Sequence, residues 1–109
     1  MQDLINEMSG KMSTLEKALG ELGKRGKAYA QSECDYRVAL AEKMLTERDK
    51  GTPVTIIGDI CRGDRAIAKL KFERDVAEVM YKSAMEAINT YKLNIKILEN
   101  QIDREWHSG

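Results

Sequence analysis

The sequence predicts an all-α fold: a long antiparallel helical hairpin with a short connector helix, which assembles into an oligomeric helical bundle. The first observation is that apolar residues recur every three or four positions over two long stretches, the spacing of helices wound as a coiled coil. The second is composition, with one Phe, one Trp and one Pro beside many helix-favouring residues. Because one helical pair encloses no core, self-association into a dimer or a larger bundle is expected.

The first helix is predicted from about residue 3 to about 49, within a first segment of residues 1–50. It ends where Asp49, Gly51 and Pro53 supply stop signals. Its predicted seam, the row of residues facing the other long helix, is Ile5, Met8, Met12, Leu15, Leu19, Leu22, Gly26, Tyr29, Glu33, Tyr36 and Leu40.

Four glycines within this helix are unusual, because each costs about 1 kcal/mol relative to alanine in a helix interior. They are Gly10, Gly20, Gly23 and Gly26. One interpretation is a kink or break near residues 20–26 that leaves residues 1–20 as a loosely docked arm. The other is that the glycines clear a strip for close approach of another helix or a ligand.

The connector, residues 51–63, is expected to contain a short helix over residues 56–62. Thr55 is a candidate N-cap for it, and Gly63 is suited to the left-handed position at its end. Asp64 is a candidate N-cap for the next helix. Ile56, Ile57 and Ile60 are expected to give the short helix an apolar side.

The second long helix is predicted over residues 64–106, followed by a frayed tail of residues 107–109. Its predicted seam is Ile67, Leu70, Arg74, Ala77, Tyr81, Ala84, Ile88, Tyr91, Ile95, Leu98 and Ile102. A second apolar strip lies off this seam and needs another partner. Its members are Phe72, Val76, Val79, Leu93 and Ile97.

Folding the two long helices against each other predicts a register in which facing residue numbers add up to about 110. The expected apolar pairs are Leu40 with Leu70, Leu22 with Ile88, Leu15 with Ile95 and Met12 with Leu98. The polar exceptions then coincide as Tyr36 with Arg74, Glu33 with Ala77 and Tyr29 with Tyr81.

This polar cluster is the candidate site, since an unpaired charge in a seam is unfavourable. One interpretation is a buried Glu33–Arg74 pair that fixes the register, as polar seam residues do in coiled coils. The other is a pocket for an anion, because residues 62–74 carry five basic and two acidic side chains. The predicted ligand-binding residues are Glu33, Tyr36, Arg37, Arg62, Lys69, Lys71, Arg74, Tyr81 and Lys82.

Several function classes lack support in the residues. The net charge is zero, and each half is neutral, which argues against general attraction to nucleic acid or membrane. With His107 as the sole histidine and no phosphate-binding loop, neither an enzyme, a metal site nor a cofactor is expected. Carboxylates on facing helices lack the Glu-x-x-His pattern of bundle metal sites. Cys34 and Cys61 are expected to be reduced, buried thiols of a protein in the bacterial host cytoplasm.

Residues 55–70 also have the outline of a helix-turn-helix, a short helix, a glycine-containing turn and a helix entered at Arg65. A recognition helix that continues for about 40 residues with a heptad seam is unusual. The tripeptide Arg62, Gly63 and Asp64 has a sufficient role as a helix stop and a helix start, and we do not read it as an adhesion motif.

Five short runs carry a resemblance that spans about residues 28–106. They are Tyr29-Ala30 through Asp35-Tyr36-Arg37, Pro53-Val54-Thr55, Arg62-Gly63-Asp64, Lys71-Phe72 through Arg74-Asp75, and Ala87-Ile88-Asn89. With these, the chain resembles small helical proteins encoded by phages and prophages of Gram-positive bacteria. The resemblance implies a setting inside a bacterial host, and it carries over no functional residue.

The function predicted from these observations is a non-catalytic phage protein, an antagonist of bacterial defence that binds or sequesters a small phosphorylated, nucleotide-like ligand at the polar cluster. Two alternatives stay open. The first is a nucleic-acid accessory protein for phage recombination or replication. The second is a coiled-coil adaptor that binds a protein partner through the second apolar strip, which includes Phe72, Val76 and Val79.

Overall fold

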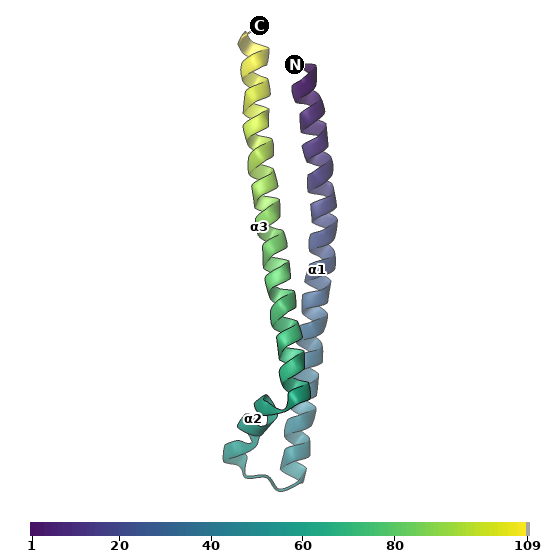
Figure 1. Ribbon diagram of the computed structural model, residues 1–109, viewed down its shortest axis with the longest axis vertical. Helices are drawn as coiled ribbons and strands as arrows, with labels where there is room; N and C mark the ends of the chain where they lie inside the picture. Colours follow the sequence, from purple (N-terminus) through teal and green to yellow (C-terminus); the bar gives the residue numbers. More distant parts are fainter. Residues whose placement is uncertain (109) are drawn as a thin grey trace. The chain divides into compact units, whose positions relative to one another are not determined.

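The computed structural model describes residues 1–108, and this part of the chain forms three helices: α1 (Gln2–Asp49), α2 (Val54–Gly63) and α3 (Arg65–Ser108) (Figure 1). It holds no strand. The predicted all-α antiparallel hairpin with a short connector helix is confirmed. Gly109, the last residue of the expected frayed tail, lies outside the described residues, whereas His107 and Ser108 belong to α3.

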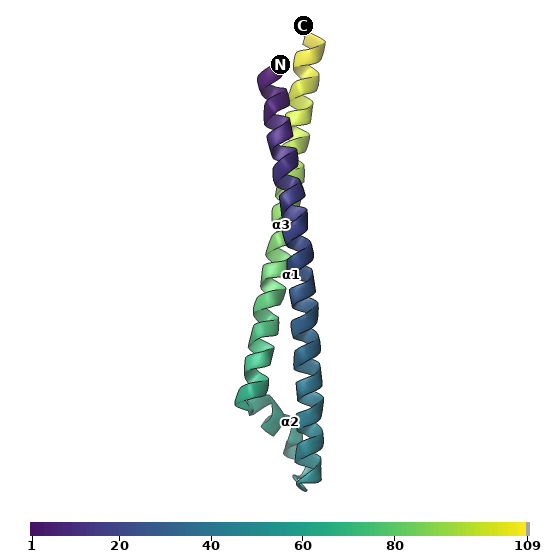
Figure 2. The same ribbon diagram turned by 90° about the vertical axis from the view of Figure 1, so that its right-hand side faces the viewer.

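The chain divides into two compact units, and both long helices run through both. The first unit combines Met1–Arg25 with Tyr81–Gly109, and the second is Gly26–Met80. Within the first unit, the start of α1 and the end of α3 lie side by side and run in opposite directions (Figures 1 and 2). The second unit holds the rest of α1, the whole of α2 and the start of α3.

The seam predicted for α3 is confirmed along its whole length, because each of its members from residue 67 to residue 102 is buried or half-buried. In the first unit Ala84, Ile88 and Leu98 are its buried members, and in the second unit Ile67 is. Heptad spacing alone therefore located the inward face of this helix.

The seam predicted for α1 is confirmed in the second unit, where each of its members from residue 26 to residue 40 is half-buried, and it is rotated in the first unit. In the first unit Met8, Leu15 and Leu22 are half-buried as expected, but the alternate row of Ile5, Met12 and Leu19 is 45, 44 and 47 % exposed. The half-buried row beside them is instead Leu4, Lys11, Ala18 and Arg25. The apolar stripe of α1 is wider than one partner helix covers, so its outer row stays in solvent.

Polar contacts between the long helices lie close to the predicted register. Met1 contacts Glu105 in the first unit, and Glu33 contacts Arg74 in the second. The residue numbers of these two pairs add up to 106 and 107, whereas those of Tyr36 and Arg74, whose side chains also meet, add up to 110. A long side chain reaches neighbours about one helical turn away, so the bond from Arg74 to Glu33 leaves the expected pairing of Glu33 with Ala77 a prediction.

A glycine turn ends α1. Gly51 has φ +82°, the left-handed conformation that a residue without Cβ adopts at low cost. The backbone N–H of Thr52 then donates to the carbonyl oxygen of Glu47 at 3.1 Å, closing the helix end. The stop signals of the sequence are thus realised at Asp49.

The caps of α2 differ from the expectation. The helix begins at Val54 after Pro53, with no side-chain cap, so Thr55 is inside the helix and is not its N-cap. Gly63 is the last helical residue and does not take a positive φ, because extended Asp64 reverses the chain instead. The Asp64 carboxylate accepts a hydrogen bond from the Ile67 N–H at 3.2 Å, which confirms it as the N-cap of α3.

The core of the second unit forms where α2 packs on the long helices. Ile57 and Cys61 of α2 and Ile67 of α3 are 8, 0 and 5 % exposed. Ile56 and Ile60 are 44 and 38 % exposed, so one isoleucine of the expected three is buried. Both cysteines are free, but Cys34 is exposed, and the expectation of two buried thiols is wrong for it. Its position on the outer side of α1 is the reason.

The glycines do not interrupt α1, which is continuous from Gln2 to Asp49. The expected break at residues 20–26 is therefore wrong, and the expected kink stays a prediction. A Cβ added at Gly10, Gly20 or Gly23 would meet nothing within 4 Å. These three glycines thus border open space in the isolated chain.

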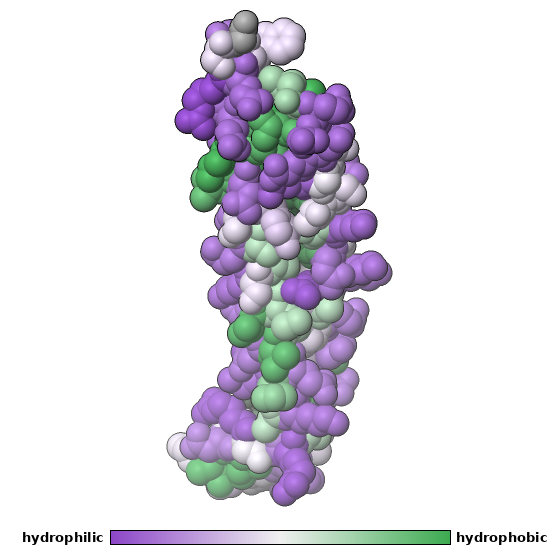
Figure 3. All heavy atoms as spheres, turned by 45° about the horizontal axis from the view of Figure 1, so that its top comes forward, coloured by the Kyte–Doolittle hydropathy of each residue, from purple (hydrophilic) through white to green (hydrophobic). Residues whose placement is uncertain are grey.

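Most of the face drawn in Figure 3 is polar. Apolar side chains are exposed on it in several places. Among residues 1–108 no helix has the length and apolar character needed to cross a membrane.

Candidate functional site

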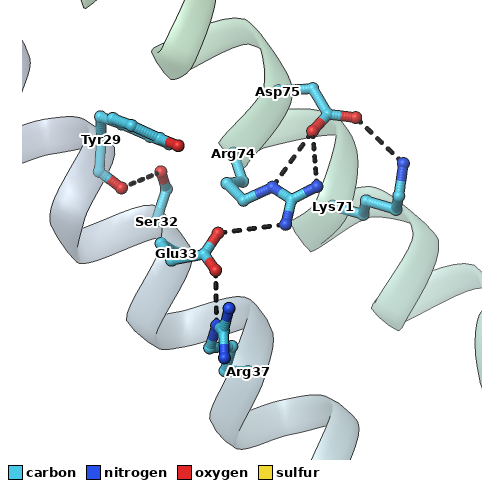
Figure 4. Close-up of polar contacts among 7 residues, drawn as sticks. All are labelled: Tyr29, Ser32, Glu33, Arg37, Lys71, Arg74 and Asp75. Carbon is cyan, nitrogen blue, oxygen red and sulfur yellow. Dashed lines mark hydrogen bonds and ion pairs between the residues drawn. The ribbon is translucent and has the colours of Figure 1, made fainter.

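The polar cluster of the second unit is centred on Arg74, which α3 directs toward α1 (Figure 4). Its Nη1 donates to Oε2 of Glu33 at 3.1 Å, and its Nε and Nη2 donate to Oδ1 of Asp75 at 3.1 and 2.8 Å. The guanidinium carbon lies 4.9 Å from the centre of the Tyr36 ring, a cation–π distance. The predicted approach of Tyr36 to Arg74 is thereby confirmed.

Two further cations complete the network. Nε of Arg37 donates to Oε1 of Glu33 one turn away on α1, and Nζ of Lys71 donates to Oδ2 of Asp75 at 3.1 Å on α3. Each carboxylate therefore joins an arginine across or beside the seam to a cation on its own helix. The spacing of four residues in both pairs is the one that brings helix side chains together.

The charges in this network stabilise one another's ionised forms. Hydrogen bonds from Arg37 and then Arg74 lower the pKa of Glu33 below its ordinary value of 4.5. Hydrogen bonds from Arg74 and Lys71 lower the pKa of Asp75 below 3.8. The bond to Asp75 is the main cause of a raised pKa for Arg74. All three groups are thus charged at neutral pH.

The geometry fits a lock for the helix register better than an open anion site. All three nitrogens of the Arg74 guanidinium already donate to carboxylate oxygens. Three of the five N–H groups of this guanidinium are thus engaged, and a phosphate that approached the other two would meet the negative charges of Glu33 and Asp75. The pair expected to be buried is in fact about a quarter exposed, at 21 % for Arg74 and 26 % for Glu33. Water therefore screens the pair, which limits its contribution to stability.

The structure brings five of the nine predicted ligand residues together: Glu33, Tyr36, Arg37, Lys71 and Arg74. Arg62 instead bonds to Asp59 on α2 at 2.8 Å, and Lys69 is exposed on α3. Tyr81 and Lys82 belong to the first unit. Whether these nine residues bind a ligand stays a prediction.

Asp75 was absent from the predicted ligand set although it makes two of the bonds to Arg74. Its signal in the sequence was the spacing of four from Lys71, which places the two side chains on one face of α3. The adjacency to Arg74 carried no such signal, because neighbouring helix residues normally point to different faces. This bond depends on the rotamers that the packing selects.

A second polar group, missed by sequence reasoning, surrounds Glu47 near the end of α1. This carboxylate is 7 % exposed and accepts a hydrogen bond from Oγ1 of Thr52 at 2.8 Å. Lys43 and Lys50 lie 3.3 and 3.6 Å from it, and Lys43 also reaches Asp64 at 3.7 Å. The bond from Thr52 is the largest cause of its lowered pKa. These contacts tie the connector to α1 and to the start of α3.

An apolar groove lies between α1 and α2 in the second unit, with a volume of about 480 Å³. Arg48 is the one charged residue of its lining, which is completed by Ala41, Met44, Leu45, Val54, Ile57 and Gly58. Leu45 and Val54 are 58 and 81 % exposed at its edge. The groove offers apolar contact and little hydrogen bonding.

The second apolar strip of the sequence lies on α3, and we call it the α3 strip: Phe72, Val76, Val79, Leu93 and Ile97. These side chains are exposed, as their position off the seam predicts. In the second unit Phe72, Val76 and Val79 are 68, 46 and 62 % exposed, and in the first unit Leu93 and Ile97 are 60 and 54 % exposed. Single exposed apolar residues are ordinary, but a row along one helix face is a feature of binding surfaces.

Within residues 1–108 no three side chains of the metal-binding types lie close enough together to hold a metal ion. The fold and these surfaces define a small helical-hairpin protein whose long helices are held by apolar contact and by polar bonds that include the one between Glu33 and Arg74. Comparison with known proteins adds no family: no family model, curated protein or solved structure matches the chain.

Proposed function

We propose that this chain is a non-catalytic helical adaptor that binds a protein partner through the α3 strip. The observation that carries the proposal is the exposure of Phe72, Val76 and Val79, at 68, 46 and 62 %. Their spacing of four and then three residues is the anchor pattern of a helix that lays its apolar face into a groove on another protein. A large exposed aromatic at the head of such a row is a typical binding anchor.

The partner expected from the setting is a protein of a bacterial host. This part of the proposal rests on the resemblance to small phage proteins and on the predicted role as an antagonist of host defence. Blocking a host protein requires an exposed recognition surface and no catalytic group. The α3 strip supplies such a surface.

Sequestration of a small phosphorylated ligand at the polar cluster is less well supported. Glu33 and Asp75 accept from three of the five N–H groups of Arg74, and their negative charges oppose the approach of an anion. Exchange of a partly exposed carboxylate for a phosphate brings little new hydrogen bonding and leaves the carboxylate without its partner. We therefore assign the cluster a structural role.

The nucleic-acid alternative is also less well supported. A helix-turn-helix joins its helices by a turn of about 3–4 residues, whereas Asp64 alone separates α2 from α3. The net charge of zero gives no broad phosphate-binding surface. Salt-dependent binding to DNA would be the observation that restores this alternative.

The test uses the full chain carrying a photo-crosslinking residue at position 79, expressed in the bacterial host. We expect it to capture one defined protein, and we expect Phe72→Glu to abolish the capture because a charge enters the apolar contact. The matched control is Ala66→Glu, an exposed position in the first turn of α3 where an added carboxylate suits the helix dipole. It should leave capture intact.

Two results would count against the adaptor. One is a capture that Phe72→Glu and Ala66→Glu affect equally. The other is native mass spectrometry that finds a small phosphorylated molecule on the purified chain, lost on Arg74→Ala while the helical circular dichroism persists. The second result would reinstate the ligand-binding function.

A further inference from the structure

The outward side of α1 in the first unit is nearly free of charge. At 100° per residue, one third of the helix circumference collects the residues that we call the outer face: Gln2, Ile5, Ser9, Met12, Ser13, Glu16, Leu19, Gly20 and Gly23. All nine are exposed. Glu16 is the one charged side chain among them, in a chain of which 33 % of residues are charged. Loss of charge from an exposed face is a compositional mark of protein interfaces.

The apolar residues of the outer face form a regular row. Ile5, Met12 and Leu19 are spaced seven residues apart and are 45, 44 and 47 % exposed. They border the seam residues Met8 and Leu15, which are half-buried against α3. The row is therefore continuous with the apolar interior of the unit and is not an isolated patch.

Small residues accompany the row. Ser9, Ser13, Gly20 and Gly23 lie on the outer face, and a Cβ at either glycine would meet no atom within 4 Å. Small side chains let a second helix backbone approach closely. The glycines lower the helix-forming tendency of α1 in the isolated chain, so close packing against another helix gives them a role.

The accessible surface of the chain is larger than that of a compact monomer of the same mass. The chain exposes 7962 Å², whereas a compact monomer of its mass, 12.3 kDa, exposes about 6100 Å². The excess, about 1900 Å², belongs to the whole chain, and the outer face contributes part of it; a standard interface buries roughly 800 Å² on each partner. In the first unit Ala84, Ile88 and Leu98 are the buried apolar side chains among the described residues. A second helical surface would complete its core.

We propose that the outer face of α1 packs against the same face of a second copy of this chain, with the two helices antiparallel and Met12 at the two-fold axis. Ile5 of one copy then lies against Leu19 of the other, because both are seven residues from Met12. This symmetry makes the row self-complementary, as an isologous dimer requires. Glu16 of each copy falls beside Ser9 of the other, so no like charges face each other.

A second copy fits this face better than a charged or irregular partner. The face offers no charge pattern to select a different protein, and the neutral chain does not repel itself. The dimer is independent of the adaptor function, since it uses α1 and leaves the α3 strip exposed. Loss of one is therefore distinguishable from loss of the other.

The test is sedimentation equilibrium of the full chain at micromolar concentration. We expect twice the chain mass for the unaltered protein and the single-chain mass for Met12→Glu, because two carboxylates would meet at the axis. Thr14→Glu is the control, an exposed site two residues along the same helix and off the outer face. It should keep the double mass.

An equal mixture of Met12→Glu and Met12→Lys chains provides the decisive arm. Opposite charges then meet at the two-fold axis, and we expect the double mass to return. We expect Met12→Lys alone to give the single-chain mass. Circular dichroism of each variant checks that the helices persist. An unaltered chain that sediments as a monomer, a Met12→Glu chain that keeps the double mass, or a mixture that stays monomeric would each overturn the proposal.

Discussion

In the two units of this chain, α1 and α3 are held together by different interactions. In the first unit the helices meet through apolar layers that include Ile88 and Leu98, at 4 and 3 % exposure. In the second, the Glu33–Arg74 bond crosses the seam and α2 adds a third helix with Ile57 and Cys61 in its core. Apolar contact is non-directional, whereas a charged bond requires particular partners. The second unit therefore defines the register, and the first supplies area.

Removing an apolar layer is expected to have the largest effect on this comparison. Ile88→Ala in the first unit should lower the free energy of unfolding by about 2–4 kcal/mol, since a buried side chain is lost and a cavity remains. Urea denaturation followed by circular dichroism measures it. Leu93→Ala, at a position 60 % exposed, is the control and should change the value by less than about 0.5 kcal/mol. Equal effects of the two substitutions would contradict the assigned core.

Cutting the polar bond across the seam tests the second unit. Arg74→Met should lower the unfolding free energy more than Arg37→Met, because Arg74 bonds to Glu33 of α1 and Asp75 of α3 while Arg37 is 77 % exposed and bonds within α1. A double-mutant cycle that combines Arg74→Met with Glu33→Gln should give a coupling energy at least as large as that of the cycle that combines Arg37→Met with Glu33→Gln. A larger coupling for Arg37 would refute the lock across the seam.

Acid should weaken the second unit through its carboxylates. Glu33 and Glu47 have pKa values lowered from 4.5, and Asp75 from 3.8. A lowered pKa means that the folded chain binds the proton less tightly than the unfolded chain. The stabilisation is therefore complete above the unfolded pKa and is lost as the pH falls through the folded value.

Thermal unfolding of the full chain between about pH 7 and about pH 2 measures this loss. The midpoint should fall mainly below pH 4.5. In the Glu33→Gln variant the fall should be shallower, because one of the shifted groups is gone. A steeper fall in that variant would show that Glu33 is not stabilised by its arginines. The raised pKa of Lys43 contributes stabilisation that is constant below its ordinary 10.5 and is lost only as the pH rises above that value, so it adds no pH dependence in this range.

The smallest expected effects distinguish two kinds of glycine. Gly51→Ala should lower the unfolding free energy by about 1 kcal/mol, because φ is +82° there and an L side chain is strained in that region. Gly10→Ala should raise it by up to about 1 kcal/mol, since the position is helical and a methyl group meets nothing within 4 Å. Chemical denaturation measures both, and effects of the same sign would contradict the assignment.

Much of the fold followed from the sequence because heptad spacing and stop signals act locally. The α3 seam, the end of α1 at Asp49 and the N-cap at Asp64 were predicted correctly. The caps of α2 were not, because Pro53 and extended Asp64 begin and end that helix without using Thr55 or a left-handed Gly63. The predicted N-cap of α2, Thr55, and the observed one, Pro53, lie two residues apart. Helix propensity along the chain does not distinguish them.

The sequence predicted part of the candidate site, again from the spacing of residues along each helix. Polar side chains at seam positions marked Glu33, Tyr36 and Arg74, and the structure brings these three together. The bond from Arg74 to Asp75 had no signal, since it depends on side-chain rotamers. Burial of Glu47 had none either, because it arises when the connector folds back and Thr52 reaches the carboxylate.

By itself, the sequence determined that this protein is helical, where α1 ends and which face of α3 turns inward, because helix propensity and apolar spacing act within a few residues along the chain. The tertiary structure decided that Ile5, Met12 and Leu19 of the predicted α1 seam stay exposed in the first unit, and that both Glu33 and Asp75 bond to Arg74. Those choices depend on the shape and bonds of the partner helix, which the spacing within one helix does not encode.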